Sequence, residues 1–375
     1  MAVAYTIDPM HTILVLGGYG FFGERISASL ASDSSIRLLV AGRDAAKAAA
    51  LVARLHLPTD QAVVVDANDP GLSARLRELR VNTLIHTAGP FQAQKYTVAT
   101  AAIAAGCHYV DLADGRQFVA GIESLDAAAR ERGVTVVSGA SSVPALSSAV
   151  IDRFLPRFKR LDSIEFGISS GARAPGLATV RGVFSYGGKP FQEWRDGAWR
   201  TTYGWLDLRR HLFPPPLGAR WVSSCDIPDL TLFPKRYPTA RTISFHAGFA
   251  SGLGHLVVCG LASLVRARLL KNLTPFAVPL SRISHWIEPL ISDQGGMFVA
   301  LAGEGHENNG LYISWNLLAR QNHGPYIPCG AAIALSRKLA NGGGVPIGAM
   351  PCVGLLTVKE FLAPLRNLDI REVVE

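Results

Sequence analysis

The sequence predicts an α/β protein, with a Rossmann-type doubly wound parallel sheet followed by a second α+β domain. Through the first 150 residues, short runs of Val, Ile and Leu alternate with helical segments. A glycine-rich turn lies between the first apolar run and the first helical segment. Such alternation is typical of a parallel sheet covered on both faces, and right-handed crossovers then make the fold doubly wound.

The expected elements of the first domain follow from these runs. The expected strands are residues 12–16, 36–41, 62–65, 82–87, 108–111 and 134–138. The expected helices are residues 24–31, 44–55, 96–105 and 119–132. Together they predict a cofactor-binding domain over residues 1–150.

The character of the sequence changes after about residue 155, where aromatic residues and Pro/Gly punctuation become more frequent. Residues 297–320 indicate two strands joined through Asn308-Asn309-Gly310, which is a hairpin signal. We therefore expect an α+β domain for substrate binding or dimerisation over residues 151–345. Residues 346–375 are expected to form a C-terminal segment whose amphipathic helix, residues 357–368, packs back on the first domain.

Composition narrows the functional classes. The 375 residues are 49% apolar and 18% charged, with a mean hydropathy of +0.22, which excludes a disordered chain. This apolar excess indicates surface covered by a partner subunit in a homodimer, by an apolar ligand or by a membrane. The net charge of +8 suits an anionic ligand, but no dense Lys/Arg run is present, so no nucleic-acid partner is expected.

The five cysteines are widely spaced and form no CxxC pair. This argues against a disulfide framework and a zinc site, and is typical of a reducing cytoplasm. The N-terminal residues lack a basic region followed by an apolar core, so no secretory signal is expected. We therefore expect a cytoplasmic protein, with peripheral membrane association as a further hypothesis.

Residues 242–265 carry no Asp, Glu, Lys or Arg. Their densest apolar part, residues 256–265, is half the length of about 20 residues that a bilayer requires. The pattern indicates a strand, a glycine-rich loop and a helix that is followed by Arg266, Arg268 and Lys271. Two interpretations stay open: a buried core helix, or contact with a membrane or lipid through residues 253–271.

The turn after the first strand contains the pattern GxGxxG at Gly18, Gly20 and Gly23. The first glycine permits a tight turn, the second lets the backbone approach a diphosphate, and the third permits close helix–strand packing. The N-terminus of the following helix then supplies free N–H groups to an anion. The expected cofactor-binding residues of this turn are Gly18, Tyr19, Gly20, Phe21, Phe22 and Gly23.

The end of the second strand indicates which dinucleotide binds. An NAD site usually has an acidic residue there, whereas this chain has Arg43, whose guanidinium fits a 2′-phosphate. This favours NADP. Alternatively, Asp44 binds the ribose of NAD, or it only caps the next helix while Arg43 is solvated. Asp66, after the third strand, either lies near the adenine or closes a turn.

Three further motifs follow in order: HTAGPF at residues 86–91, GCHYVD at 106–111 and SGASSVP at 138–144. Together with the glycine turn, they make residues 10–155 resemble the saccharopine dehydrogenase-like family of NADP-binding oxidoreductases. The resemblance implies a Rossmann domain and a substrate domain, with the nicotinamide near the ends of the fourth and fifth strands. It also implies that Ala88, Gly89 and Pro90 form a turn beneath the nicotinamide ribose.

One departure from the family concerns the substrate contacts. Many members have Gly-Glu soon after the motif at 106–111, where this chain has Leu112-Ala113-Asp114-Gly115-Arg116. The family's substrate contacts are therefore not transferred to Asp114 or Arg116. The resemblance also implies substrates that range from amino-acid derivatives to lipid-like and polyketide-like molecules.

Two residues are candidates for proton transfer. Asp111 ends the fifth strand, where it either orients or deprotonates a substrate or caps the next segment. Tyr186 precedes two glycines in the second domain, where it either donates a proton or forms part of a turn. The histidines show no metal-ligand spacing, and no nucleophile-elbow motif supports hydrolysis.

These observations predict an NADP-dependent oxidoreductase that transfers hydride between the nicotinamide and a small or acyl/lipid-like substrate. One alternative is a trans-acting enoyl or imine reductase on a carrier-linked or lipid-linked substrate. Another is a non-catalytic NADP(H)-binding protein, because the fold alone does not settle the activity.

Overall fold

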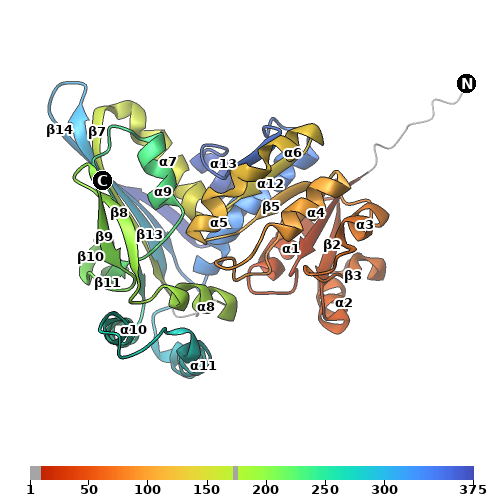
Figure 1. The fold of residues 1–375 in the computed structure, drawn as a ribbon, viewed down its shortest axis with the longest axis horizontal. Coiled ribbons are helices and arrows are strands. Elements are labelled where there is room, and N and C mark those ends of the chain that lie inside the picture. Colours follow the sequence, from red (N-terminus) through yellow and green to blue (C-terminus); the bar gives the residue numbers. More distant parts are fainter. Residues whose placement is uncertain (1–9, 172–175) are drawn as a thin grey trace, which may run out of the picture.

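The structure, a computed structural model, describes residues 10–171 and 176–375 and contains two sheets (Figure 1). The first sheet has seven strands, all parallel, in the order β15-β6-β5-β4-β1-β2-β3. Its strands are β1 (His11–Leu16), β2 (Ile36–Gly42), β3 (Ala62–Val64), β4 (Thr83–His86), β5 (His108–Asp111), β6 (Thr135–Ser138) and β15 (Gly348–Pro351). The predicted doubly wound sheet is confirmed.

Seven α-helices lie within the described part of the first 155 residues; all but the last connect strands of this sheet, and the last leads from β6 into the second sheet. They are α1 (Gly23–Ala31), α2 (Ala45–Arg54), α3 (Leu72–Glu78), α4 (Thr97–Ala105), α5 (Arg116–Ala120), α6 (Asp126–Glu131) and α7 (Ser147–Phe154). The single helix expected over residues 119–132 is wrong, because α5 ends at Ala120, with Gly121 as its C-cap, and a 3-10 turn precedes α6. At Gly121 a Cβ would lie 2.6 Å from the Tyr96 hydroxyl, so the chain is closely packed where the helix breaks.

The strand order reverses between β1 and β4, because β2 and β3 extend the sheet on one side of β1, and β4, β5 and β6 extend it on the other. In open α/β sheets, ligands bind at such a reversal, outside the carboxyl ends of the strands. The glycine turn follows β1 and the 88–90 turn follows β4, so both lie at this edge of the sheet.

The second sheet is mixed and has nine strands, with the main order β10-β11-β12-β7-β13-β14-β16. Its strands are β7 (Phe158–Ser170), β8 (Pro190–Arg195), β9 (Ala198–Tyr203), β10 (Arg209–Phe213), β11 (Gly218–Ser224), β12 (Thr242–Phe249), β13 (Gly295–Gly305), β14 (Gly310–Ala319) and β16 (Ile370–Val374). The predicted hairpin at 308–310 joins β13 and β14, with Asn308 at φ +58°.

Five longer helices accompany the second sheet and the C-terminal segment. They are α8 (Leu177–Ser185), α9 (Asp229–Arg236), α10 (Gly252–Arg266), α11 (Ala277–Ile287) and α12 (Gly330–Ala340). In the described part of the chain, none of the helices is long and apolar enough to cross a membrane.

The two parts of the molecule share one apolar core, which contains both Ile13 of β1 and Trp315 of β14. Helix α12 contacts α1, β4 and β5 of the first sheet, although the expected boundary assigns it to the second domain. The C-terminal residues supply a strand to each sheet and the short helix α13 (Val358–Leu362), which begins with a capping box between Thr357 and Glu360. The boundaries at 150 and 345 stay predictions.

Candidate functional site

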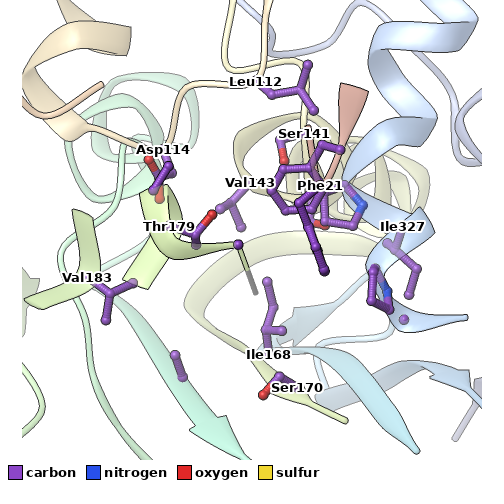
Figure 2. A pocket seen from close by; sticks show the side chains of 18 of the residues that line it. Phe21, Leu112, Asp114, Ser141, Val143, Ile168, Ser170, Thr179, Val183 and Ile327 are labelled. Carbon is purple, nitrogen blue, oxygen red and sulfur yellow. The ribbon is translucent and has the colours of Figure 1, made fainter. Parts of the chain in front are cut away.

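A cavity of about 510 Å³ lies between the two sheets, where the strand order of the first sheet reverses. From the first sheet it is lined by the glycine turn, the turn after β4 and the loops after β5 and β6. From the second part it is lined by α8 and by the ends of β7, β12 and β13. Figure 2 shows Phe21 and Val143 on one side of this space and Ile168 and Val183 on the other.

The glycine turn forms a close backbone cradle at the cavity edge. The N–H groups of Gly17 and Gly18 donate to the Ala41 carbonyl, at 2.9 and 3.0 Å. A Cβ on Gly18 would lie 2.8 Å from the Val15 carbonyl oxygen, and a Cβ on Gly23 would overlap the Gly17 carbonyl oxygen. Gly18 and Gly23 therefore set the shape of the turn, whereas Gly17 and residues 19–22 line the cavity.

Helix α1 begins at this turn without a side-chain cap, because its N-cap residue is Phe22. Uncapped helix N-termini leave backbone N–H groups free to bind an anion. The cradle and this helix end therefore fit the diphosphate of a dinucleotide.

The end of β2 carries the residues expected to bind the cofactor's ribose. The Tyr19 side chain covers Gly42, where a Cβ would overlap its hydroxyl, and that hydroxyl accepts a hydrogen bond from the Asp44 N–H at 2.8 Å. The Asp44 carboxylate accepts from the Lys47 N–H at 3.1 Å and caps α2, so its interpretation as an N-cap is confirmed. Arg43 beside it is exposed and outside the cavity lining.

Asp66 closes a turn after β3, because its carboxylate accepts from the Asn68 N–H at 3.0 Å. It does not line the cavity. The structure thus supports the turn interpretation, and contact with the adenine stays a prediction.

The turn after β4 is tied to the glycine turn. The Thr87 hydroxyl lies 2.9 Å from the Leu16 carbonyl oxygen and 3.1 Å from that of Gly17. Ala88, Gly89 and Pro90 all line the cavity, as a turn beneath a nicotinamide ribose would. The structure therefore brings together the two turns that the sequence singled out.

Asp111 lies outside the cavity lining and is fully buried. Its carboxylate accepts hydrogen bonds from the Gly139 N–H at 2.8 Å, the Ala113 N–H at 2.9 Å and the Ser138 hydroxyl at 2.9 Å. Burial raises its pKa to about 6 in spite of these hydrogen bonds. These contacts join β5 to the loop after β6, and a catalytic role for Asp111 stays a prediction without support from its position.

Asp114, three residues further on, is the carboxylate from this loop that lines the cavity (Figure 2). Burial raises its pKa, against the opposing effect of hydrogen bonds that include one from the Gln92 amide at 3.0 Å. No motif in the sequence assigns a role to Asp114. Its position just past the end of β5 was the available signal, because ligands bind outside strand ends in such sheets.

Tyr186 follows α8 and also lines the cavity. Its pKa is raised well above 10, first by burial and then by neighbouring Cys225 and Asp114. The neighbouring Cys225 thiol is itself buried, and burial raises its pKa to about 12. The cavity thus holds a protonated phenol and a carboxyl group of raised pKa, which are donors for proton transfer.

The remaining wall of the cavity is largely apolar. Trp205 and Phe249 stack with their ring centres 4.8 Å apart, and Phe245 and Met297 line the same space. Phe245 and Phe249 lie on β12, whereas Met297 lies on β13 and Trp205 on the loop before β10, so no local sequence pattern indicates that all four meet.

Arg116 connects the loop after β5 to the second part of the molecule. Its guanidinium donates to Asp226 at 2.8 Å, to the Thr231 hydroxyl at 2.6 Å and to the Gln192 carbonyl at 2.7 Å. Asp226 adjoins Cys225 of the cavity wall. Arg116 therefore holds the two walls of the cavity together.

The comparisons with known proteins agree with this architecture. Residues 13–137 match the family model described as saccharopine dehydrogenase NADP binding domain, which confirms the resemblance and NADP as the family's cofactor. No curated protein matches the chain.

Two solved structures share the fold. One is saccharopine dehydrogenase (L-Glu forming) from Saccharomyces cerevisiae, with a TM-score of 0.66 and 15% identity over 97% of this chain and 100% of that chain. The other is amine dehydrogenase from Mycobacterium smegmatis, with a TM-score of 0.50 and 12% identity over 94% of this chain and 96% of that chain. At these identities the likeness shows the fold of such oxidoreductases.

Proposed function

We propose that this chain, in which residues 13–137 form a saccharopine dehydrogenase NADP-binding domain, is an NADP-dependent oxidoreductase that acts on an apolar, acyl-type or lipid-like substrate. The observation that carries the proposal is the cavity, which runs from the two cofactor turns to an apolar wall and is also lined by the Tyr186 hydroxyl and the Asp114 carboxyl group. Pockets of this volume are typical of sites for small molecules.

The cofactor is assigned to the two turns at the sheet edge. Gly17 and residues 19–22 would hold the diphosphate, supported by Gly18 and Gly23, while Ala88, Gly89 and Pro90 would lie against the nicotinamide ribose. Exposed Arg43 would bind the 2′-phosphate, since the Asp44 carboxylate is already engaged by Lys47. When bound, the cofactor would supply or accept the hydride.

The chain's own residues would provide binding and proton transfer. The Tyr186 hydroxyl keeps its proton at neutral pH because its pKa is raised, so it would donate a hydrogen bond to the reacting heteroatom. The Asp114 carboxyl, whose pKa is moved toward neutral pH, would give up the proton in reduction and take it back in oxidation. Arg116 would act as a positioning residue, by holding Asp114 against the opposite wall.

The apolar wall favours an apolar substrate. Ile168, Phe245 and Met297 line the cavity opposite the cofactor turns. A long apolar chain bound there would be transferred out of water into apolar surroundings, which is favourable. This observation also favours the second candidate function, reduction of a C=C or C=N bond on a lipid-linked or carrier-linked substrate. A homodimer stays a prediction.

Fluorescence titration with NADPH and NADH tests the cofactor assignment. Arg43→Ala should weaken NADPH binding by about tenfold or more and leave NADH binding unchanged, because only NADPH carries the 2′-phosphate. Arg75→Ala, which removes a partly exposed arginine of α3 that pairs with Glu78, is the matched control. Unchanged NADPH affinity in Arg43→Ala would remove Arg43 from the site.

Loss of NADPH absorbance with a panel of substrates tests the reaction. Long-chain acyl, enoyl and imine compounds should be reduced faster than short amino-acid derivatives. If NADPH binds tightly but no compound in either group is reduced, the protein is a non-catalytic NADP(H)-binding protein. If only the amino-acid derivatives react, the assignment of an apolar substrate is wrong.

A further inference from the structure

Helix α10 is apolar on the face that it presents to solvent. Its buried face consists of His255, Val258, Cys259, Ala262 and Val265. The opposite face carries exposed Leu253, Leu256, Val257 and Leu264, at the spacing of one helical stripe. An amphipathic helix of a soluble protein normally has polar residues there, so this face has the composition of a covered surface.

The apolar surface continues beyond α10. Leu269 follows the helix and is 73% exposed, and α11 carries Ile283 and Trp286, of which Trp286 is 87% exposed. Figure 1 shows α10 and α11 at the same edge of the molecule, at the lower side of the view. We call residues 252–287 the α10–α11 unit.

The charge of this unit has one sign. Residues 252–287 contain Arg266, Arg268, Lys271 and Arg282 but no Asp or Glu. All four basic residues are exposed. Apolar side chains with a Trp among them, bordered by basic residues, are typical of a surface that lies on anionic lipid.

A second copy of the chain fits this surface less well. In a two-fold dimer the same patch faces itself, so the four basic residues of each copy would meet those of the other. Like charges brought together oppose association. An anionic lipid surface complements both the charge and the apolar side chains.

The α10–α11 unit also adjoins the wall of the cavity. Helix α8, which supplies Leu177, Thr179 and Val183 to the cavity lining, contacts α11. Gly188, two residues after Tyr186, lies directly on α10, where a Cβ would overlap the Ala262 carbonyl oxygen. A lipid surface on this unit would therefore lie next to the cavity.

We propose that the α10–α11 unit docks the protein on an anionic phospholipid surface, with Leu253, Leu269 and Trp286 inserted among the lipids. The docking does not depend on the redox reaction, because it needs neither cofactor nor substrate. Its failure is thus separate from failure of the proposed enzymatic function.

Co-sedimentation with vesicles tests this inference on the full chain. The protein should sediment with vesicles of phosphatidylcholine and phosphatidylglycerol, and much less with phosphatidylcholine alone. The combined variant Leu253→Gln, Leu269→Gln and Trp286→Gln should weaken binding about a thousandfold, since each of the three apolar side chains that leave water contributes about tenfold. Leu212→Gln, which changes an equally exposed leucine on β10, is the control and should bind normally.

Two further variants separate the causes. Arg268→Gln with Lys271→Gln should weaken binding to the anionic vesicles about tenfold or more, and added salt should have the same effect. Trp286→Phe should still bind but should lose the part of the blue shift in tryptophan emission that comes from insertion of Trp286.

The opposing outcomes are equally specific. Absence of sedimentation with anionic vesicles would overturn the proposal, as would binding that the combined apolar variant leaves unchanged. Sedimentation-equilibrium ultracentrifugation tests for a dimer. If the wild-type chain self-associates, the combined variant does not, and neither binds vesicles, the surface belongs to a second copy of the chain.

Discussion

Replacing Asp111 with asparagine separates a structural carboxylate from a catalytic one. The wild-type carboxylate is fully buried and accepts three hydrogen bonds that join β5 to the loop after β6. Burial raises its pKa from 3.8 to about 6. An amide of the same shape keeps the acceptor oxygen and carries no charge into the core.

The magnitude follows from the two pKa values. Between pH 3.8 and about 6, the folded protein holds a proton that the unfolded chain has released, so the free energy of unfolding falls as the pH rises. A pKa moved by this amount corresponds to about 3 kcal/mol. The asparagine of Asp111→Asn does not titrate, so the variant does not lose this stability as the pH rises. The free energy of unfolding of the variant minus that of wild type should therefore increase by about 3 kcal/mol between pH 4 and pH 7.

Urea unfolding of both proteins, repeated across this pH range, measures the effect. Asp60→Asn, which makes the same substitution at an exposed carboxylate, is the matched control. The reasoning is refuted if the difference between Asp111→Asn and wild type does not change with pH. If instead the variant is stable but NADPH-linked turnover falls by about a hundredfold or more, Asp111 takes part in the chemistry.

Three other outcomes can be tested with single substitutions. Gly23→Ala should greatly weaken NADPH binding in a titration, because its Cβ would overlap the Gly17 carbonyl oxygen. The control is Gly260→Ala on α10, where a Cβ meets open space; it should leave the free energy of unfolding unchanged or raise it by up to about 1 kcal/mol. Asp114→Asn should lower the reduction rate by about a hundredfold or more. The wild-type rate should fall as the pH rises through the raised pKa of Asp114, and the variant should lose this fall. A variant with the wild-type pH profile would contradict the role of Asp114. Arg116→Met should destabilise the protein by about 3 kcal/mol in urea unfolding, because it leaves a largely buried carboxylate unpaired, and should raise KM more than it lowers kcat.

Local sequence patterns determined the first sheet and the cofactor turns. Apolar runs of strand length predict the strands, and the glycines directly after the first run predict the cofactor turn. Both patterns are local, because backbone conformation and burial there are largely decided by neighbouring residues. The order of β1, β2 and β4 then follows from crossover handedness. The N-cap role of Asp44 was one of the alternatives that the sequence left open, and the hydrogen bond from Lys47 decided it.

Tertiary structure decided which polar groups reach the cavity. Asp111 and Asp114 are three residues apart, yet the first is enclosed by the loop after β6 and the second lines the cavity with Tyr186, which is distant in the sequence. The loop after β6 encloses Asp111, and the packing of the second sheet on the first brings Tyr186 to the same cavity as Asp114. The C-terminal strands β15 and β16 also could not be predicted from local sequence. They pair with β6 and β14, which are far away in the sequence and belong to two different sheets.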